Sequence, residues 1–390
     1  MLSKRREFLY SSIVIGTAAL TKGTIGLSSL LNQLDPIKDG KLLAVLPFSG
    51  EGRAAIGNII GEGLNGRLAL DLTKLDAKTL ITPNNEFYIR TRLPALIDLN
   101  KSWKIDVHGL VNSRISLSLK DLQSLVRPME VHLLECSGNN RGRGFGLISS
   151  AKWSGIPVID VLKKIHTSPK STRVLISGFD EHSPKILRRT SSTPGASWIF
   201  TFEDLESSGA FFATEMNGKS LPLDHGFPIR LVMPGWYGCS CIKWVNEIKL
   251  VDDTEKPTSQ MREFASRTHQ DGTPLLAKDF QPAIIDQTAM PIRVEQWLVD
   301  DKIEYRIIGI LWGGQRPTDK LMIRFNSGEK YQPVESYDHN TNKTWTLWAH
   351  TWKPLKPGSY DIQITIDDSS IRTRQLDNGY YIRAVKIDKV

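Results

Sequence analysis

The chain carries a loop that could support metal or nucleophilic chemistry, and this loop begins at Cys136. The thiol follows a strand-like run over residues 131–135, and Arg141 and Arg143 lie shortly after it. Nearby positive charge favours the thiolate, which is the form that attacks substrates or binds metals, and the interspersed glycines let a bulky ligand approach the backbone. A buried structural cysteine before a surface loop fits the same pattern. So does a cysteine nucleophile that takes its base from one of the eight histidines.

A second cluster of reactive side chains lies at residues 224–244. His225 and Arg230 are separated by a short turn that contains a proline, and together they could flank an anionic ligand. A turn with a hydrogen-bonded histidine is the simpler alternative. If the cysteines at 239 and 241 lie on a strand, they face opposite sides of it. We therefore expect two packed thiols there, because both could not chelate one metal.

Together with three further segments, these two clusters resemble the sulfite oxidase family of molybdenum enzymes. The resemblance runs from about residue 82 to the C-terminus. Besides the two loops it includes the segments at residues 82–90, 151–155 and 215–218. Several separate segments in the same order are more specific than any one motif.

The resemblance implies a molybdenum–molybdopterin cofactor and assigns roles to individual residues. Cys136 matches the cysteine whose thiolate ligates molybdenum, and a soft thiolate suits this metal. Arg90 and Arg141 match arginines that hold the substrate anion by bidentate hydrogen bonds. The positions implied to hold the pterin and its phosphate are Arg92, Asp180, His225, Arg230, Cys241 and Lys243. At two of these, Arg92 and Cys241, the animal enzyme commonly has histidine, and Cys241 looks like the bacterial sulfane-sulfur dehydrogenases instead.

The implied activity is oxygen-atom transfer on a small anion, with sulfite or a related sulfur compound as the leading substrate. Two departures from the family's sulfite oxidases bear on that substrate. Phe264 falls where they usually carry a tyrosine, and it cannot donate a hydrogen bond. The loop over residues 141–146 is shorter than in the animal and plant enzymes. The alternatives are a sulfoxide or N-oxide reductase with the same cofactor, and a non-catalytic exported binding protein with this fold.

Electron transfer would require a separate partner. The sequence contains no Cys-x-x-Cys-His motif, and we expect no haem. Electrons would then pass to a separate acceptor, such as a periplasmic cytochrome.

The sequence pattern around these residues predicts an α+β fold. Strand-like runs alternate with short helical ones between residues 82 and 251, with a helix expected over 157–165. The predicted organisation is a mixed α/β molybdopterin-binding domain over 40–252, a polar linker over 253–290 and an immunoglobulin-like β-sandwich over 291–390. In the resembling family this last domain forms a homodimer. The Gly-x-Gly-x-x-Gly at 61–66 lacks a strand and helix around it, so we interpret it as a chance match.

Composition and the first residues set the remaining expectations. Hydrophobic residues make up 40% of the chain, too many for a disordered protein, and three cysteines are too few for a disulfide scaffold. The net charge of +8 comes without a long basic run, so we expect no nucleic-acid partner. Residues 1–30 contain Arg5-Arg6 before a short apolar stretch and resemble a twin-arginine export signal. This predicts a periplasmic or otherwise exported protein.

Overall fold

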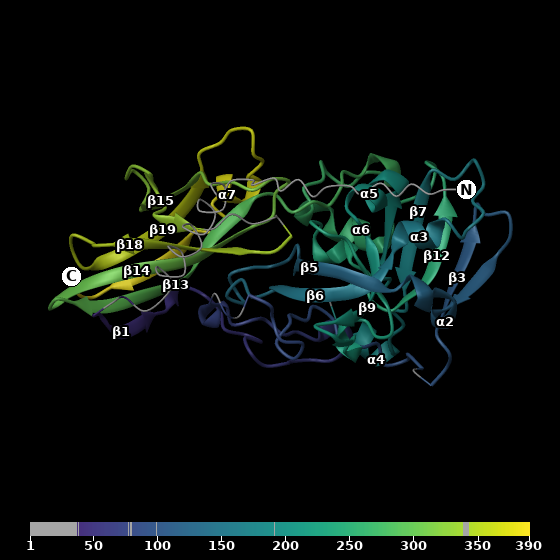
Figure 1. The fold of residues 1–390 in the computed structure, drawn as a ribbon, viewed down its shortest axis with the longest axis horizontal. Helices are drawn as coiled ribbons and strands as arrows, with labels where there is room; N and C mark the ends of the chain where they lie inside the picture. The colour runs from purple at the N-terminus through teal and green to yellow at the C-terminus, as the bar shows by residue number, and fades with distance from the viewer. Residues whose placement is uncertain are drawn as a thin grey trace, which may run out of the picture.

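The computed structural model describes residues 37–390, apart from residues 38, 77, 79, 99, 191 and 338–342. The predicted signal region at 1–30 lies outside the described residues. The chain forms two sheet-rich domains that lie side by side along the long axis of the molecule (Figure 1). In the part of the chain that the structure describes, no helix is both long and apolar enough to cross a membrane.

The first domain is built on two five-stranded sheets. One has the order β10-β9-β6-β5, with β11 also paired to β9, and the other has the order β4-β3-β12-β7-β8. The second sheet is mixed, because β12 runs parallel to β3 and antiparallel to β7. The bounds of the first sheet are β5 Arg127–Glu135, β6 Ile148–Pro157, β9 Phe211–Met216, β10 Lys219–Ser220 and β11 Arg230–Val232. Those of the second are β3 Lys104–Gly109, β4 Ile115–Ser118, β7 Arg173–Gly178, β8 Ser197–Thr201 and β12 Val245–Val251.

The helices are short and serve as connections between strands. The helix expected over 157–165 is shorter than predicted, and its buried residues Val158, Val161 and Leu162 share one face. Residues 61–66 contain one 3-10 turn, Gly63–Asn65, and no strand leads into it. The helices are α2 Leu119–Leu122, α3 Val158–Leu162, α4 Pro184–Leu187, α5 Phe202–Ser207, α6 Ser259–Phe264 and α7 Arg374–Asp377.

The C-terminal domain is a β-sandwich, which confirms the predicted fold class. Its sheets have the orders β1-β13-β14-β18-β17 and β16-β15-β19-β20-β2. It carries buried aromatic side chains such as Trp312, Trp345 and Trp348. Its later strands are β13 Thr288–Val299, β14 Lys302–Trp312, β15 Leu321–Phe325, β16 Gln332–Pro333, β17 Ser336–Tyr337, β18 Thr346–Trp352, β19 Gly358–Ile366 and β20 Arg383–Ile387.

The first two strands of the described chain belong to this C-terminal sandwich. β1 (Lys41–Leu46) pairs with β13, and β2 (Phe48–Ser49) pairs with β20. In Figure 1 β1 lies at the far side from the first domain, below β13 and β14. Residues 41–49 are therefore not part of the domain predicted to begin at residue 40. Sequence periodicity could not reveal this, because it carries no information about a partner so distant along the chain.

The predicted linker at 253–290 is packed into the first domain. It contains α6 and the 3-10 turns Ala265–Arg267 and Ala277–Asp279. Tyr237 donates its backbone N–H to the carbonyl of Ala283 at 2.8 Å. Its polar composition is typical of a linker, yet Phe264 is buried, and the segment forms part of a wall of the cavity described below.

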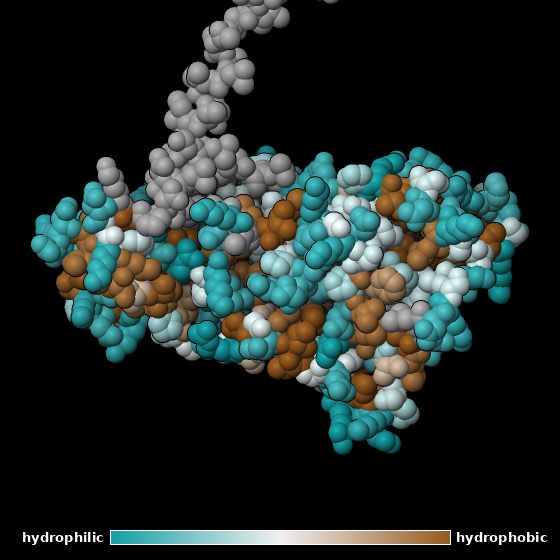
Figure 2. All heavy atoms as spheres, turned by 60° about the horizontal axis from the view of Figure 1, so that its bottom comes forward, coloured by the Kyte–Doolittle hydropathy of each residue, from teal (hydrophilic) through white to brown (hydrophobic). Residues whose placement is uncertain are grey.

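One face of the molecule carries apolar patches between polar side chains, over both domains (Figure 2). Among the exposed apolar residues are Leu42, Leu43 and Val45 of β1, each more than 40% exposed. β1 is the outer strand of its sheet, so these side chains lie beside unpaired backbone groups. Exposed, apolar edge strands are surfaces to which other chains can add.

Candidate active site

Cys136 lies at the end of β5, at the inner end of the loop singled out from the sequence. The residue is 4% exposed, and its N–H donates to the carbonyl of Leu147 at 2.9 Å. The backbone N–H of Gly138 donates to Cys136 Sγ at 3.3 Å, and the N–H of Asn139 donates to the Cys136 carbonyl at 2.8 Å. These bonds fix the thiol on a tight loop and direct a donor at its sulfur, which suits a sulfur that carries negative charge.

The thiol forms part of the wall of a cavity of about 850 Å³, including its open mouth. Most of the residues predicted for the cofactor and substrate come together there. Those that line it are Arg90, Cys136, Asp180, His225, Arg230, Cys241 and Lys243. They come from strand ends and loops of both sheets of the first domain and are distant from one another in the sequence.

Buried positive charge is concentrated in the inner part of this cavity. Arg230 is 5% exposed and donates to the carbonyls of His225 and Cys241 at 3.2 and 3.3 Å. Lys243 Nζ donates to the carbonyls of Thr91 and Asp224 at 2.5 and 2.9 Å. Burial, and then repulsion from Arg230, lowers the pKa of Lys243 to about 7. The site therefore pays a desolvation cost to hold cations, a cost that an anionic ligand would offset.

His225 is held neutral beside these cations. Its Nε2 lies 3.1 Å from the carbonyl of Asn84, and its ring packs edge-on against Phe87 at 5.4 Å. Burial, followed by the charges of Lys243 and Arg230, lowers its pKa to about 3. A neutral imidazole has one N–H, which Nε2 donates to the Asn84 carbonyl, so Nδ1 remains as an uncharged acceptor.

The donors left over in the cavity fit an anionic cofactor such as molybdopterin. Arg230 Nε and Arg90 Nη1 are buried and have no hydrogen-bond partner among the described residues. Buried polar atoms normally have hydrogen-bond partners, so both nitrogens are free to donate hydrogen bonds to a ligand. Phosphate and pterin oxygens and ring nitrogens are acceptors of this kind. The donor set and the neighbouring thiol therefore agree with the group that the sequence resemblance implies.

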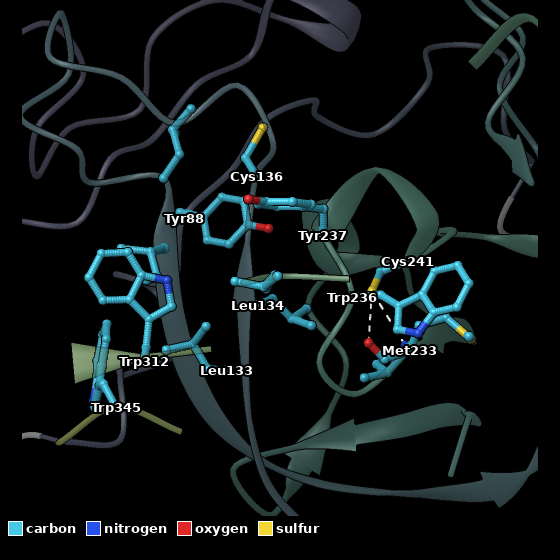
Figure 3. Close-up of a cluster of buried hydrophobic side chains, with 14 of the residues drawn as sticks. Tyr88, Leu133, Leu134, Cys136, Met233, Trp236, Tyr237, Cys241, Trp312 and Trp345 are labelled. Atoms are coloured by element: carbon cyan, nitrogen blue, oxygen red, sulfur yellow. Dashed lines mark hydrogen bonds between the residues drawn. The ribbon is translucent and has the colours of Figure 1, made fainter. Parts of the chain in front are cut away.

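The two further cysteines also lie in the cavity wall. The backbone over Gly238–Ser240 forms a 3-10 turn instead of a strand, so Cys239 and Cys241 do not face opposite sides of a sheet as expected, and both line the cavity. Burial raises the pKa of both thiols. Figure 3 shows Cys241 turned towards Met233, whose N–H lies 3.4 Å from the cysteine sulfur. The expectation of packed thiols agrees with this burial.

Asp180 organises the segment that closes one side of the cavity. Its Oδ2 accepts hydrogen bonds from the backbone N–H groups of Gly195 and Ala196 at 2.7 and 3.1 Å. Its Oδ1 lies 2.6 Å from Nε2 of His182. The adjacent residues Ser192 and Thr193 line the cavity. In this structure Asp180 holds the wall in place, and its predicted contact with the cofactor stays a prediction.

Arg92 and Arg141 are not among the residues that line the cavity. Arg92 Nε donates to Asp224 Oδ2 at 2.9 Å, and its stem fills the space left by Gly66, where a Cβ would lie 2.1 Å from Arg92 Cγ. Arg141 is exposed and donates from Nη2 to the carbonyl of Ile382 at 2.6 Å. The structure thus directs Arg141 to the C-terminal domain, and its predicted substrate role stays a prediction.

A different arginine, which the sequence did not single out, lies beside the cysteine. A Cβ built on Gly138 would lie 3.3 Å from Arg267 Nη1 and 3.7 Å from Cys136 Sγ, so both atoms face the same small space. The guanidinium also stacks over the ring of Phe264, with 5.5 Å between Cζ and the ring centroid. Among the described residues, no acidic side chain pairs with Arg267. Its position in a polar segment resembling a linker gave no signal in the sequence.

Two other residues of the site escaped the sequence analysis. Arg67 donates from Nη1 to the carbonyl of Arg90 at 2.5 Å and so supports the backbone of that predicted substrate residue. Burial, followed by repulsion from Arg90, lowers the pKa of Arg67 to about 9. Tyr88 lines the cavity and lies close to Cys136 in Figure 3. Its place two residues before Arg90 in the segment 82–90 was the available signal.

Comparison with known proteins agrees with this site. The model of the oxidoreductase molybdopterin-binding domain matches residues 91–259. Mitochondrial sulfite oxidase of Drosophila melanogaster is 25% identical over 343 residues, covering 80% of this chain and 57% of that protein. Sulfite oxidase of Gallus gallus is 30% identical over 325 residues, covering 73% and 66%. The chain spans a little over half the length of the first of these relatives.

A solved structure shares the fold across both domains. The sulfane dehydrogenase SoxCD from Paracoccus pantotrophus superposes with a TM-score of 0.62 at 17% identity, covering 86% of this chain and 84% of that one. This identity supports likeness of fold alone. With the domain match, the sequence relatives and the cavity taken together, the chain belongs to the sulfite oxidase family of molybdopterin-binding oxidoreductases.

Proposed function

We propose that this chain is a molybdopterin-dependent oxidoreductase that acts on a small sulfur-containing anion and passes electrons to a separate acceptor. The observation that carries the proposal is the buried Cys136 thiol in the wall of a cavity whose inner part holds Arg230 and Lys243. The names of the relatives supply the substrate class, since they include sulfite oxidases and a sulfane dehydrogenase.

The residues of the chain divide into those that hold the cofactor and those that hold the substrate. Cys136 would ligate molybdenum, and Arg230, Lys243 and His225 would hold the pterin and its phosphate. When bound, this group supplies two-electron redox chemistry and oxygen-atom transfer. Oxidation of sulfite to sulfate takes one oxygen atom from water and releases two protons and two electrons. The electrons must then reach an acceptor outside this chain.

The substrate anion would be held beside the thiol by arginines. Arg90 presents a buried Nη1 without a partner among the described residues, and Arg267 lies against the same space as Cys136 Sγ. Two guanidinium groups can satisfy several oxygens of one oxyanion, and their charge offsets its desolvation. Phe264 contributes an apolar surface to this region, so the arginines would supply the charge and hydrogen bonds that select an anion.

The first test is the molybdenum content of the purified chain by elemental mass spectrometry. We expect about one metal per chain, and turnover of sulfite or a sulfane compound with an artificial electron acceptor. Cys136→Ser should abolish turnover and change the spectrum of the metal. Cys239→Ser, which alters another cysteine of the cavity wall, should leave that spectrum unchanged. A wild-type chain without molybdenum, from a host that loads a related enzyme, would refute the proposal.

Reduction of a sulfoxide or N-oxide is a second candidate activity because of Phe264. The residue is 7% exposed, lines the cavity and offers no hydroxyl, so it matches neutral, less polar substrates better than a tyrosine would. A sulfoxide or N-oxide reductase would consume electrons from an artificial donor. Assays in both directions decide between the two activities. Absence of bound pterin would favour the non-catalytic binding protein.

We propose export through the twin-arginine pathway on the strength of the sequence at residues 1–30. Arg5 and Arg6 precede a short apolar stretch, and this pathway moves folded proteins, including those already loaded with cofactor. Replacing both arginines with lysine should retain the protein in the cytoplasm, as fractionation would show. Lys4→Gln, which keeps the arginine pair, is the control. Unchanged export of the double variant would count against this pathway.

We also propose that the chain forms a homodimer through its C-terminal sandwich and donates electrons to a separate protein such as a periplasmic cytochrome. The exposed apolar residues of the outer strand β1 support the first part. Leu43→Glu should convert the dimer to a monomer in light scattering. Leu355→Glu, at a side chain that is 97% exposed, should not.

A further inference from the structure

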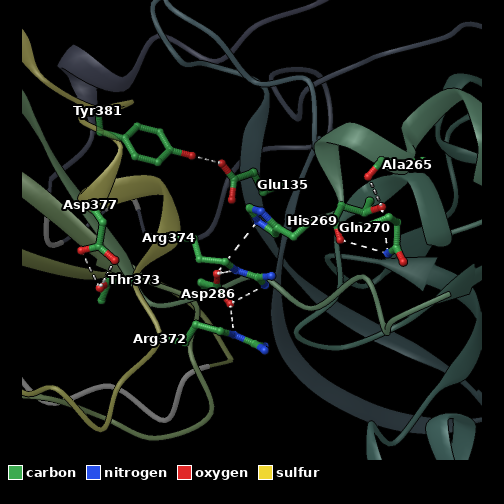
Figure 4. Close-up of polar contacts among 11 residues, drawn as sticks. Glu135, Ala265, His269, Gln270, Asp286, Arg372, Thr373, Arg374, Asp377 and Tyr381 are labelled. Atoms are coloured by element: carbon green, nitrogen blue, oxygen red, sulfur yellow. Dashed lines mark hydrogen bonds and ion pairs between the residues drawn. The ribbon is translucent and has the colours of Figure 1, made fainter. Parts of the chain in front are cut away.

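Strand β5 ends in a buried glutamate, Glu135, immediately before Cys136. The residue is 1% exposed, and among the described residues no arginine or lysine pairs with it. Its carboxylate accepts hydrogen bonds from Trp312 Nε1 at 2.8 Å, from the hydroxyl of Tyr381 at 2.8 Å and from Asn139 Nδ2 at 3.2 Å. Figure 4 shows the Tyr381 hydroxyl directed at this carboxylate. Two of the three donors therefore come from the C-terminal sandwich.

Asn139 links this carboxylate to the rest of the cysteine loop. Its amide nitrogen bonds Glu135, its Oδ1 accepts from the N–H of Leu147 at 3.0 Å, and its own N–H donates to the carbonyl of Cys136. The Tyr380 hydroxyl donates to the carbonyl of Asn139. The two ends of the loop around the thiol are thus tied to each other and to the C-terminal domain.

A second contact holds the outer part of the same loop. Arg141 donates to the carbonyl of Ile382, which follows Tyr380 and Tyr381 directly. One short segment of the sandwich, 380–382, therefore makes hydrogen bonds to the loop over 135–141 at several points. Arg141, for which the sequence resemblance implies a role in holding the substrate anion, takes part in this contact.

The chemistry of the contact specifies a carboxylate at position 135. The two carboxyl oxygens of Glu135 are the acceptors for all three donors, Trp312, Tyr381 and Asn139. A glutamine of the same shape would turn its NH₂ group against at least one donor and leave a buried group unpaired. A purely apolar contact would satisfy none of them.

We propose that Glu135 is a positioning residue through which the C-terminal sandwich fixes the direction of the Cys136 thiol. The sandwich is then a working part of the metal site in addition to any part it has in assembly. The identity of Cys136 as a molybdenum ligand rests on the proposed function. The positioning of the thiol itself does not, and it can be measured without the metal.

The test compares thiol reactivity in the full chain produced without cofactor. Glu135→Gln should speed alkylation of Cys136 by iodoacetamide about tenfold, equivalent to about 1.4 kcal/mol of loop stability. Tyr381→Phe, which removes one donor and keeps the charge, should speed it less. The control is Glu130→Gln on the same strand, where an exposed glutamate pairs with Lys343, and it should change nothing. Peptide mapping reads Cys136 separately from the other two cysteines.

The second readout is the molybdenum(V) electron paramagnetic resonance spectrum of the loaded chain. Glu135→Gln should shift it, because the thiolate would meet the metal at a different angle, and Glu130→Gln should not. An unchanged alkylation rate and spectrum in folded Glu135→Gln would overturn the inference, as would equal acceleration at all three cysteines. If Glu135→Gln does not fold, Tyr381→Phe decides by its Cys136 rate alone. A wild type without molybdenum would refute the proposed function and leave the alkylation test intact.

Discussion

Replacing Arg267 with methionine should raise the KM for the anionic substrate about tenfold and leave the molybdenum content unchanged. Methionine keeps an apolar stem against Phe264 and removes only the charge and its donors. The guanidinium shares one small space with Cys136 Sγ, and the proposed function would place the substrate beside that sulfur. The change therefore isolates the contribution of this positive charge to substrate binding.

The magnitude follows from the exposure of the side chain. Opposite charges about 4 Å apart attract by about 4 kcal/mol at an effective dielectric constant of 20, and by about 1 kcal/mol in bulk water. Arg267 is exposed, so the value should lie near the lower limit. A loss of about 1.4 kcal/mol corresponds to a factor of ten. Because the interaction is screened, the difference between wild type and variant should also shrink at high salt.

The assay is steady-state turnover of sulfite, or of whichever sulfur anion supports it, with an artificial electron acceptor. Arg141→Met is the matched control. Its guanidinium donates to Ile382, so we expect a KM within about twofold of wild type. The opposite pattern, with Arg141→Met raising KM tenfold and Arg267→Met changing nothing, would refute the assignment drawn from the structure. It would restore the assignment that the sequence resemblance implies.

Three further changes test other parts of the molecule. The pKa of Lys243 is about 7, against an ordinary value of 10.5, so between these values the unfolded chain binds more protons than the folded one. The free energy of unfolding of the cofactor-free chain should therefore rise with pH across this window, and urea titrations of Lys243→Met should lack that component. Gly178→Ala would place a Cβ 1.9 Å from the carbonyl oxygen of Lys243. We expect a lower melting temperature and a lower molybdenum content, and full retention of both would contradict the close packing. Glu51→Gln would leave the buried Arg383 without its partner, and should lower the free energy of unfolding by about 3 kcal/mol in denaturant titrations; a loss below about 1 kcal/mol would show that the pair is solvated.

Much of the fold could be predicted because its strands show local patterns. The run over 131–135 lies within β5, and the region predicted as a β-sandwich over 291–390 contains β14, β15, β18 and β19. The pairing of β1 with β13 could not be predicted, because it depends on two segments about 250 residues apart. The polar residues and prolines of the segment 253–290 are typical of a linker. Its few apolar side chains, Phe264 among them, are enough to pack it into the first domain.

The residues of the candidate site also fall into those that the sequence could predict and those that it could not. Most of the residues taken from the resemblance line one cavity, because the loops that carry them end at neighbouring strands of the first domain. The direction of Arg141 depends on a carbonyl in the other domain, which local sequence does not encode. Arg267 looks like an ordinary surface arginine until Gly138 and Phe264 are placed beside it. In the sequence Glu135 looks like the polar end of a strand, because its hydrogen-bond donors Trp312 and Tyr381 lie far away along the chain.

The pairing of β2 with β20 sets the order in which the chain can complete its fold. β2 ends at Ser49, and its partner strand β20 spans Arg383–Ile387, more than 300 residues later in the chain. During synthesis β2 must wait until β20 has left the ribosome before the sandwich can close. Closing so long a loop is entropically costly and slow. The edge groups of β1 and β2 therefore stay unpaired until β13 and β20 have been made.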